Sequence, residues 1–264
     1  MCASCDARDD LRGEIARMKR VVLLWLLALA CVAGFVRLGI WQLHRAEFKE
    51  ALLAHSHQVL AEREAQPLAT AADAPMPDKE SPDAYEWTSG NGHFLPVPAI
   101  RLDNQARGGQ QGIRVYRVFQ PDGARHALLV ELGWRSLPSR KDIAAEPDPP
   151  SVSQVRGMLS PPPAAGINLG GSAIQRQSDG SLLLIRLDPD SVASALHIGN
   201  GLAPRVLRLD PGMKIGYKRD LAMLSGTLPP EQHRGYAVQW FALAAGLLIA
   251  TIVVSRRKSA RKDS

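Results

Sequence analysis

Two short segments, far apart in the sequence, carry the side chains best suited to binding a ligand. They are residues 41–45 and residues 233–241. Their notable members are Trp41, Gln42 and Arg45 in the first segment, and His233, Tyr236, Gln239 and Trp240 in the second. Imidazole, amide, guanidinium and aromatic groups offer hydrogen bonds, charge and flat apolar faces. Each segment lies at the edge of a long apolar stretch, so we expect the two to form one shared site at a membrane boundary.

The apolar stretches predict the elements that would position these side chains. Residues 21–40 are apolar apart from Arg37. At about 1.5 Å per helical residue they cover the roughly 30 Å hydrocarbon core of a bilayer. No Gly or Pro follows directly, so the helix should project outward, and we assign it to residues 21–49. The second span, residues 229–254, begins at a Pro-Pro pair and ends before a basic run.

Helical spacing predicts a common face on each helix. Trp41 and Arg45 lie one turn apart on the first helix, and Tyr236 and Trp240 share a face with His233 on the second. Small residues at 242 and 244–246 permit close approach of another helix, most simply the first span. The competing interpretation is that these side chains only anchor the helices in the headgroup zone.

Charge is concentrated at the two ends of the chain. The formal net charge is +6, yet the sequence between the spans is nearly neutral. Lys and Arg beside apolar spans mark the cytoplasmic face. We therefore expect a two-pass protein of the bacterial inner membrane, with the tails 1–20 and 255–264 in the cytoplasm and the central residues in the periplasm. This interpretation replaces that of basic arms for nucleic acid, and no nucleic-acid partner is expected.

A cleavable signal peptide is the alternative interpretation of the first stretch, because Ala28-Leu29-Ala30 fits a small-x-small cleavage site. The apolar run continues past Ala30 to Ile40, so cleavage there would discard half of one continuous span. We expect the span to be retained. The sequence leaves both Met1 and Met18 open as the start.

Between the spans, the sequence predicts a linker at 50–84 and an extracytoplasmic domain at 85–228. Residues 67–82 are rich in Ala, Pro and Asp and lack an apolar period. Asp188 precedes an apolar run in a pattern typical of a helix start. Strands are expected near residues 94–97, 100–102, 112–119, 127–133, 151–159, 182–187 and 205–209. The predicted fold is α+β: two transmembrane helices flank a mostly antiparallel, β-rich domain with one or two small helices.

Enzymatic motifs are missing from the central sequence. It contains no Gly-rich phosphate loop, no G-x-S-x-G elbow, no His pair at metal-binding helical spacing and no carboxylate cluster beside a base. Its histidines, His93, His126 and His197, occur singly, which favours surface or packing roles. The domain has no cysteine and cannot depend on disulfides. We expect a protein that is not an enzyme.

The motifs of the whole chain resemble the Surfeit locus protein 1 family, membrane factors that help to assemble haem-copper cytochrome c oxidase. The resemblance rests on Gly39-Ile40-Trp41-Gln42-x-x-Arg45-x-x-x-Lys49, Gly112-Ile113-Arg114-Val115-Tyr116, Asp122-Gly123, Leu129-Val130-x-x-Gly133-Trp134, Gly157-x-Leu159 and Pro229-Pro230-x-x-His233-x-x-Tyr236-Ala237-x-Gln239-Trp240-Phe241-x-Leu243-Ala244. One departure is Glu131-Leu132, where the family usually has Asn-Arg before the Gly-Trp pair.

The resemblance implies handling of haem a during its insertion into oxidase subunit I, or stabilisation of that subunit, with other assembly factors as further partners. It implies His233 as the candidate ligand of the haem iron, since a neutral imidazole at an apolar boundary can ligate iron. Aromatic side chains can pack on the macrocycle, and Arg45 or Arg234 can meet the propionates. The residues expected to surround His233 in the cofactor site are Trp41, Gln42, Arg45, Tyr236, Gln239 and Trp240. No role is assigned to His44.

Two other hypotheses stay open at this point. In the first, the central domain is a scaffold or sensor for an envelope partner, and the spans only tether it without handling haem. In the second, the protein is a membrane enzyme that modifies haem, which is disfavoured because two spans supply too few polar groups for a reaction centre.

Overall fold

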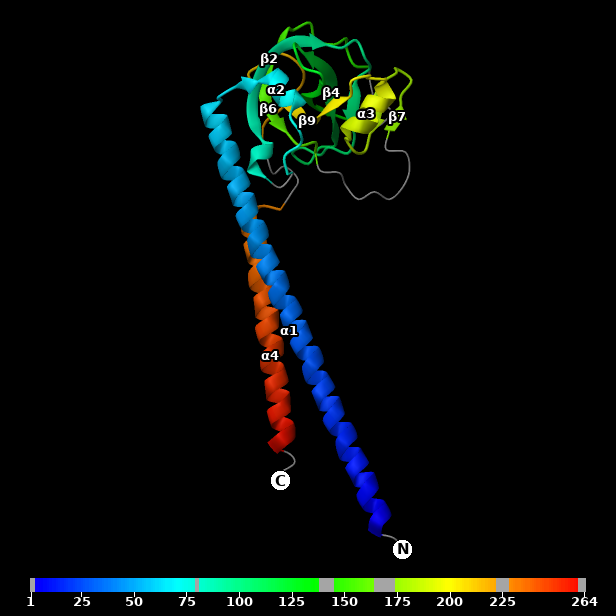
Figure 1. The fold of residues 1–264 in the computed structure, drawn as a ribbon, viewed down its shortest axis with the longest axis vertical. Helices are drawn as coiled ribbons and strands as arrows, with labels where there is room; N and C mark the ends of the chain where they lie inside the picture. Colours follow the sequence, from blue (N-terminus) through cyan, green and yellow to red (C-terminus); the bar gives the residue numbers. More distant parts are fainter. Residues whose placement is uncertain (1–2, 79–80, 138–144, 164–173, 222–227, 261–264) are drawn as a thin grey trace. The chain divides into compact units, whose positions relative to one another are not determined.

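The two long helices and a β sheet belong to different units of the chain. The computed structural model describes residues 3–78, 81–137, 145–163, 174–221 and 228–260. One unit comprises Met1–Glu50 with Thr227–Ser264, and the other comprises Ala51–Gly226. The first unit holds most of helix α1 (Ala3–Glu62) together with α4 (Pro230–Ala260), and the second holds the sheet (Figure 1).

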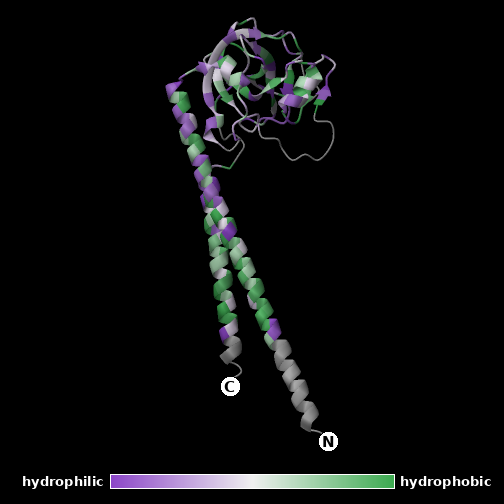
Figure 2. Ribbon diagram, in the orientation of Figure 1, coloured by the Kyte–Doolittle hydropathy of each residue, from purple (hydrophilic) through white to green (hydrophobic). Residues whose placement is uncertain are grey.

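Each long helix contains an apolar segment long enough to cross a membrane, within Met18–Glu62 of α1 and within Pro230–Arg256 of α4. Figure 2 shows hydrophobic colour along most of α4, and a change along α1 from hydrophobic to hydrophilic. Large apolar side chains along these segments are exposed, among them Leu23 and Val238. α1 continues beyond residue 49 and ends before Arg63, whose positive φ of 48° leaves the helical conformation.

A mixed sheet organises the second unit. Its strands are β1 (Gln66–Pro67), β2 (Glu86–Phe94), β3 (Ile100–Leu102), β4 (Gly112–Pro121), β5 (Ala127–Ser136), β6 (Gln154–Ser160), β7 (Ile174–Arg176), β8 (Leu182–Leu184) and β9 (Leu202–Leu209). Most neighbours are antiparallel, whereas β1–β2, β3–β8 and β5–β9 are parallel. β2 pairs with both β6 and β4, so the order β2–β6–β9–β5–β4 closes into a small barrel. The predicted α+β class with a β-rich domain is confirmed.

The central strands of the barrel are buried on both faces. Along β5, Leu128 and Val130 join an apolar cluster with Leu68 of helix α2 (Leu68–Asp73). The intervening Leu129 points to the opposite face, as the two-residue period of a strand requires. There it belongs to a second cluster, with Val192 of helix α3 (Pro189–Leu196). Asp188 caps α3 as the sequence predicted, because its carboxylate accepts the N–H of Ser191.

Residues 50–84, predicted from composition as a linker, contain regular structure. The last turns of α1, strand β1, helix α2 and a short 3₁₀ turn (η1, Pro82–Ala84) lie within this range. α2 lacks a helical apolar period of useful length, but Leu68 and Ala72 are buried against the barrel. This tertiary packing stabilises a helix that local sequence alone would not. Asp73 fixes its end by accepting the backbone N–H groups of Arg125 and His126, each at 3.0 Å.

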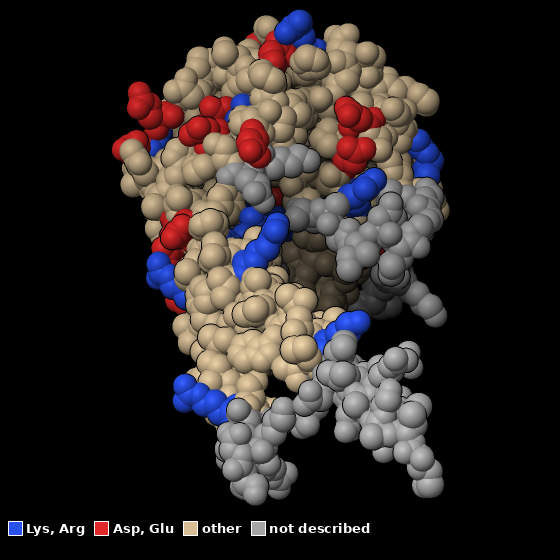
Figure 3. All heavy atoms as spheres, turned by 60° about the horizontal axis from the view of Figure 1, so that its bottom comes forward, with Lys and Arg blue, Asp and Glu red and all other residues tan. Residues whose placement is uncertain are grey.

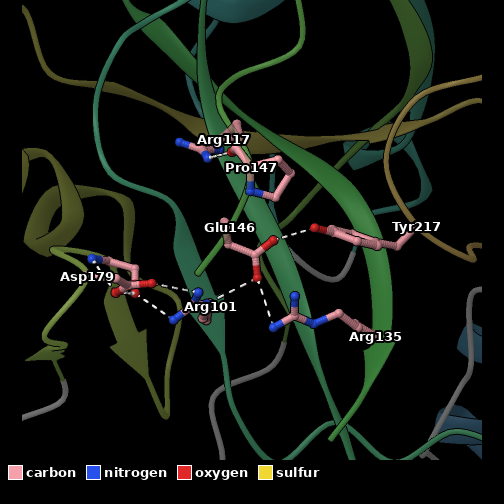
Figure 4. Close-up of polar contacts among 8 residues, drawn as sticks. Arg101, Arg117, Arg135, Glu146, Pro147, Asp179 and Tyr217 are labelled. Atoms are coloured by element: carbon pink, nitrogen blue, oxygen red, sulfur yellow. Dashed lines mark hydrogen bonds and ion pairs between the residues drawn. The ribbon is translucent and has the colours of Figure 1, made fainter. Parts of the chain in front are cut away.

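A buried ionic cluster centred on Glu146 connects several strands and loops of this unit (Figure 4). One Glu146 oxygen accepts bonds from Arg101 and Arg135, each at 3.2 Å, and the other accepts the Tyr217 hydroxyl. Arg101 also donates to Asp179 at 2.8 Å. Burial, together with the bond to Glu146, raises the pKa of Tyr217 to about 12. Both Glu146 oxygens accept bonds, so we interpret the cluster as structural support.

Charged side chains of both signs are interspersed over the part of the β-rich surface visible in Figure 3. This mixture agrees with the nearly neutral sequence between the two apolar stretches. A surface of mixed sign favours solubility and gives no single-sign field to attract a polyanion on that face.

Candidate functional site

Residues 35–50 of α1 pack against the first turns of α4 within the first unit. The Phe35 and Trp240 rings stack with their centroids 5.7 Å apart. Gly39 leaves room for Phe241, since a Cβ atom at Gly39 would lie 2.7 Å from that ring. Ala237 is buried at the same contact face of α4. Small residues therefore bring the two helices close together, as is common between apolar helices.

A hydrogen bond between Gln42 and His233 joins the two helices. The Nδ1 atom of His233 lies 2.6 Å from the side-chain oxygen of Gln42. An amide oxygen only accepts, so in this arrangement Nδ1 carries the hydrogen, and in the neutral imidazole Nε2 keeps its lone pair. The Nε2 atom is buried and has no hydrogen-bond partner among the described residues. Since His233 is only 6% exposed, the lone pair is held away from bulk water.

Two basic residues of α1, one turn apart, lie near this imidazole. Arg45 and Lys49 are both within electrostatic range of His233. Lys49 is buried, and its ammonium donates to the carbonyl of Leu228, just before α4. The Arg45 guanidinium lies 5.0 Å from the centre of the Phe48 ring. The surroundings of His233 are therefore positively charged.

Arg234, the other cation expected to meet a carboxylate, is already in an ion pair. Its Nη2 atom lies 2.8 Å from a carboxylate oxygen of Glu50. The Arg234 side chain is 56% exposed and the Glu50 side chain 39%, so water screens the pair and it is worth little free energy. We interpret this ion pair as a polar contact at the edge of the helix pair.

The structure shows direct or electrostatic interactions with His233 for some of the expected site residues. Gln42 bonds to His233, and Arg45 lies near it. Trp240 stacks on Phe35, which lies one helical turn before Gly39. Trp41, Tyr236 and Gln239 lie on exposed helix faces, as does the unassigned His44. Any packing of these aromatic rings on a ligand stays a prediction.

Sequence reasoning missed Lys49 as a member of this site, although it ends the first motif. The helical spacing of residues in the sequence could have identified Lys49 as a member of the same helix face as Gln42. Gln42, Ala46 and Lys49 follow the i, i+4, i+7 pattern that defines one helix face. Ala46 and Lys49 are both buried, which confirms that this face is covered.

The other histidines for which partners are described have local structural roles. His126 bonds through Nδ1 to Asp73 at 2.9 Å, and His55 bonds to the carbonyl of Tyr85 at 3.1 Å. His197 ends α3 in a left-handed conformation. Within the described ranges, no group of three or more His, Cys, Asp or Glu residues is placed to hold a metal ion.

A comparison with protein-family models identifies one match. The model described as the SURF1 family matches residues 29–245, which include the helix contact and the whole β-rich unit. No curated protein matches the chain.

Proposed function

Because the chain belongs to the SURF1 family, known as cytochrome oxidase assembly factors, we propose that it holds haem a for insertion into subunit I of a haem-copper oxidase. His233 is the proposed ligand of the iron. The observation that carries this proposal is its buried Nε2 atom, which keeps a lone pair and has no partner among the described residues. The family is one of assembly factors and not of catalysts, so holding the ligand without turnover suffices.

The chemistry of the donor atoms fits haem better than a bare metal ion. A haem macrocycle supplies four nitrogen ligands to its iron, so a protein needs to add only one or two. The described residues offer one buried imidazole and no cluster of several ligands. The hydrogen bond that Nδ1–H donates to the Gln42 oxygen fixes the tautomer that leaves Nε2 available, which is the role that outer partners of metal-bound histidines commonly have.

The exposed apolar faces of the helices support a location in the bacterial inner membrane. In this proposal α1 and α4 each cross the bilayer once, both termini are cytoplasmic, and the β-rich unit is periplasmic, as the flanking basic residues predict. The residues around Gln42 and His233 follow the first apolar segment and precede the second. A haem bound there would lie at the membrane boundary, where subunit I and other assembly factors have access to it.

A spectroscopic comparison of two histidine variants tests the proposal. The full chain is purified in detergent from cells that make haem a, as wild type, His233→Ala and His44→Ala. His44 is the matched control, since it lies on α1 near Gln42 but is exposed. We expect wild type and His44→Ala to carry haem with the Soret band of histidine ligation. We expect His233→Ala to carry about tenfold less, with free imidazole restoring the band.

Either of two results would contradict the proposed function. One is a wild-type protein that carries no haem from such cells. The other is a His233→Ala protein that carries as much haem as wild type with an unchanged Soret band. The His44→Ala control separates both results from a general effect of removing a histidine near the membrane boundary.

A further inference from the structure

Lys49 is a buried cation without a carboxylate partner among the described residues. The residue is 6% exposed, and its one described hydrogen bond goes to the carbonyl oxygen of Leu228. An ammonium group has three N–H donors, so two remain for another acceptor. Removing a charged ammonium from water is unfavourable unless an opposite charge compensates it. The site therefore has an unbalanced positive charge.

The nearby acidic residues do not supply this balance. Glu50 is adjacent to Lys49 in sequence, but its carboxylate is paired with Arg234 at 2.8 Å. Glu47 is exposed, and residues two apart on a helix do not face each other. Glu231, in the first turn of α4, is also exposed and makes no described bond to Lys49. Arg45 adds a second positive charge on the same side.

The unbalanced charge and the unpartnered imidazole nitrogen lie in one place. His233 presents a lone pair, and Lys49 presents free N–H donors and a charge within electrostatic range of that ring. The chemical complement of these two groups is a ligand that contains both a metal centre and a carboxylate. Arg234 is less suited to the carboxylate because Glu50 already occupies it.

We propose that Lys49 binds a carboxylate of the porphyrin held by His233, so that the site selects porphyrins with free propionates. This inference rests on the proposed function. It assigns recognition of the porphyrin carboxylates to the Lys49 ammonium group. Lys49 takes no part in ligating the iron. Its removal should therefore change the affinity for the acid without changing the type of iron ligation.

Two probes that differ only at the carboxylates test the inference. Haemin and haemin dimethyl ester are titrated into the haem-free full chain in detergent. We expect wild type to bind haemin about tenfold more tightly than the ester. Lys49→Met, which keeps an unbranched side chain of similar length, should bind both equally and keep the histidine-ligated Soret band. Lys49→Arg should keep the preference, and so should Arg234→Met, which removes the exposed cation.

The outcomes separate this inference from the function on which it rests. A wild type that binds both probes equally through His233 would overturn the role of Lys49 and leave the proposed function intact. The same conclusion would follow from an undiminished preference in Lys49→Met, or in Lys49→Gln if the Met variant does not fold. A wild type that binds neither probe would overturn this inference, and it would overturn the proposed function too if that protein also carries no haem from cells that make haem a.

Discussion

At the scale of single residues, the Gln42–His233 hydrogen bond determines which imidazole nitrogen is available to a ligand. Gln42→Leu keeps much of the side-chain volume but removes the acceptor for Nδ1. We expect the affinity for haemin to fall by roughly 10- to 100-fold, the usual effect of losing an outer partner of a metal-bound histidine. Gln239→Leu, on an exposed face of α4, is the matched control. Equal affinities for the two variants would show that Gln42 does not orient the ring.

Residue types and their positions beside the apolar helices allow part of this site to be predicted from the sequence. Gln42 and His233 belong to one predicted set because both occur at the edge of an apolar helix. Their bond is not predictable in this way, because the rotation of two helices about their own axes is set by packing between residues such as Gly39 and Phe241. The burial of Lys49 could not be predicted from the sequence either, because lysine is mostly exposed in proteins.

At the scale of elements, the carboxylate of Asp73 makes the attachment of α2 dependent on pH. The backbone N–H of Arg125, with that of His126, lowers the pKa of Asp73 to about 2. The charged form is thus bound in the folded state, and it stabilises the fold above the unfolded-state pKa of about 4. This contribution is lost as the pH falls from about 4 to about 2. We expect Asp73→Asn to be less stable than wild type at pH 7 and equally stable near pH 2.

Thermal unfolding of the detergent-solubilised chain, followed by circular dichroism at pH 7, 4, 3 and 2, measures this difference. Asp122→Asn is a suitable control, since Asp122 is an exposed residue in the β4–β5 turn. A gap between Asp73→Asn and wild type that stays constant down to pH 2 would show that the ionised carboxylate does not provide the stability.

Several strands of the sheet were predicted correctly from the sequence, whereas β2 was missed because of the glycines within it. β3 was predicted with its observed bounds, and the starts of β4 and β5 were also correct. β2 was missed, because Gly90 and Gly92 resemble turn signals. In the barrel these glycines allow close contacts: a Cβ atom would lie 2.5 Å from Leu68 at the first and 2.2 Å from the Gln120 carbonyl at the second. The local pattern cannot distinguish a turn from such a contact.

At the scale of the whole molecule, the closure of the barrel was the feature least visible in the sequence. It depends on pairing β2 with β4 and on the parallel pairing of β5 with β9, strands that are widely separated along the chain. Strand patterns show which residues can pair, but not which strands do. The two long apolar helices were predictable because apolar length is a local signal.

Because the helices and the β-rich domain belong to different units, two hypotheses can be tested separately. In one the helices handle haem, and in the other they only tether the β-rich unit. In one chimera, residues 21–50 and 230–256 are replaced by unrelated apolar helices with the same flanking charges, and the β-rich unit is kept. In the matched control, only residues 21–34 and 247–256 are replaced, which keeps the contacts of Phe35, Gly39 and Gln42 with α4. We expect the first chimera to lose oxidase assembly in cells that lack the native protein, and the control to retain it. Limited proteolysis of both chimeras checks that the β-rich unit is folded. Full assembly with the first chimera would show that the helices act only as anchors, because no residue of the proposed haem site would then remain.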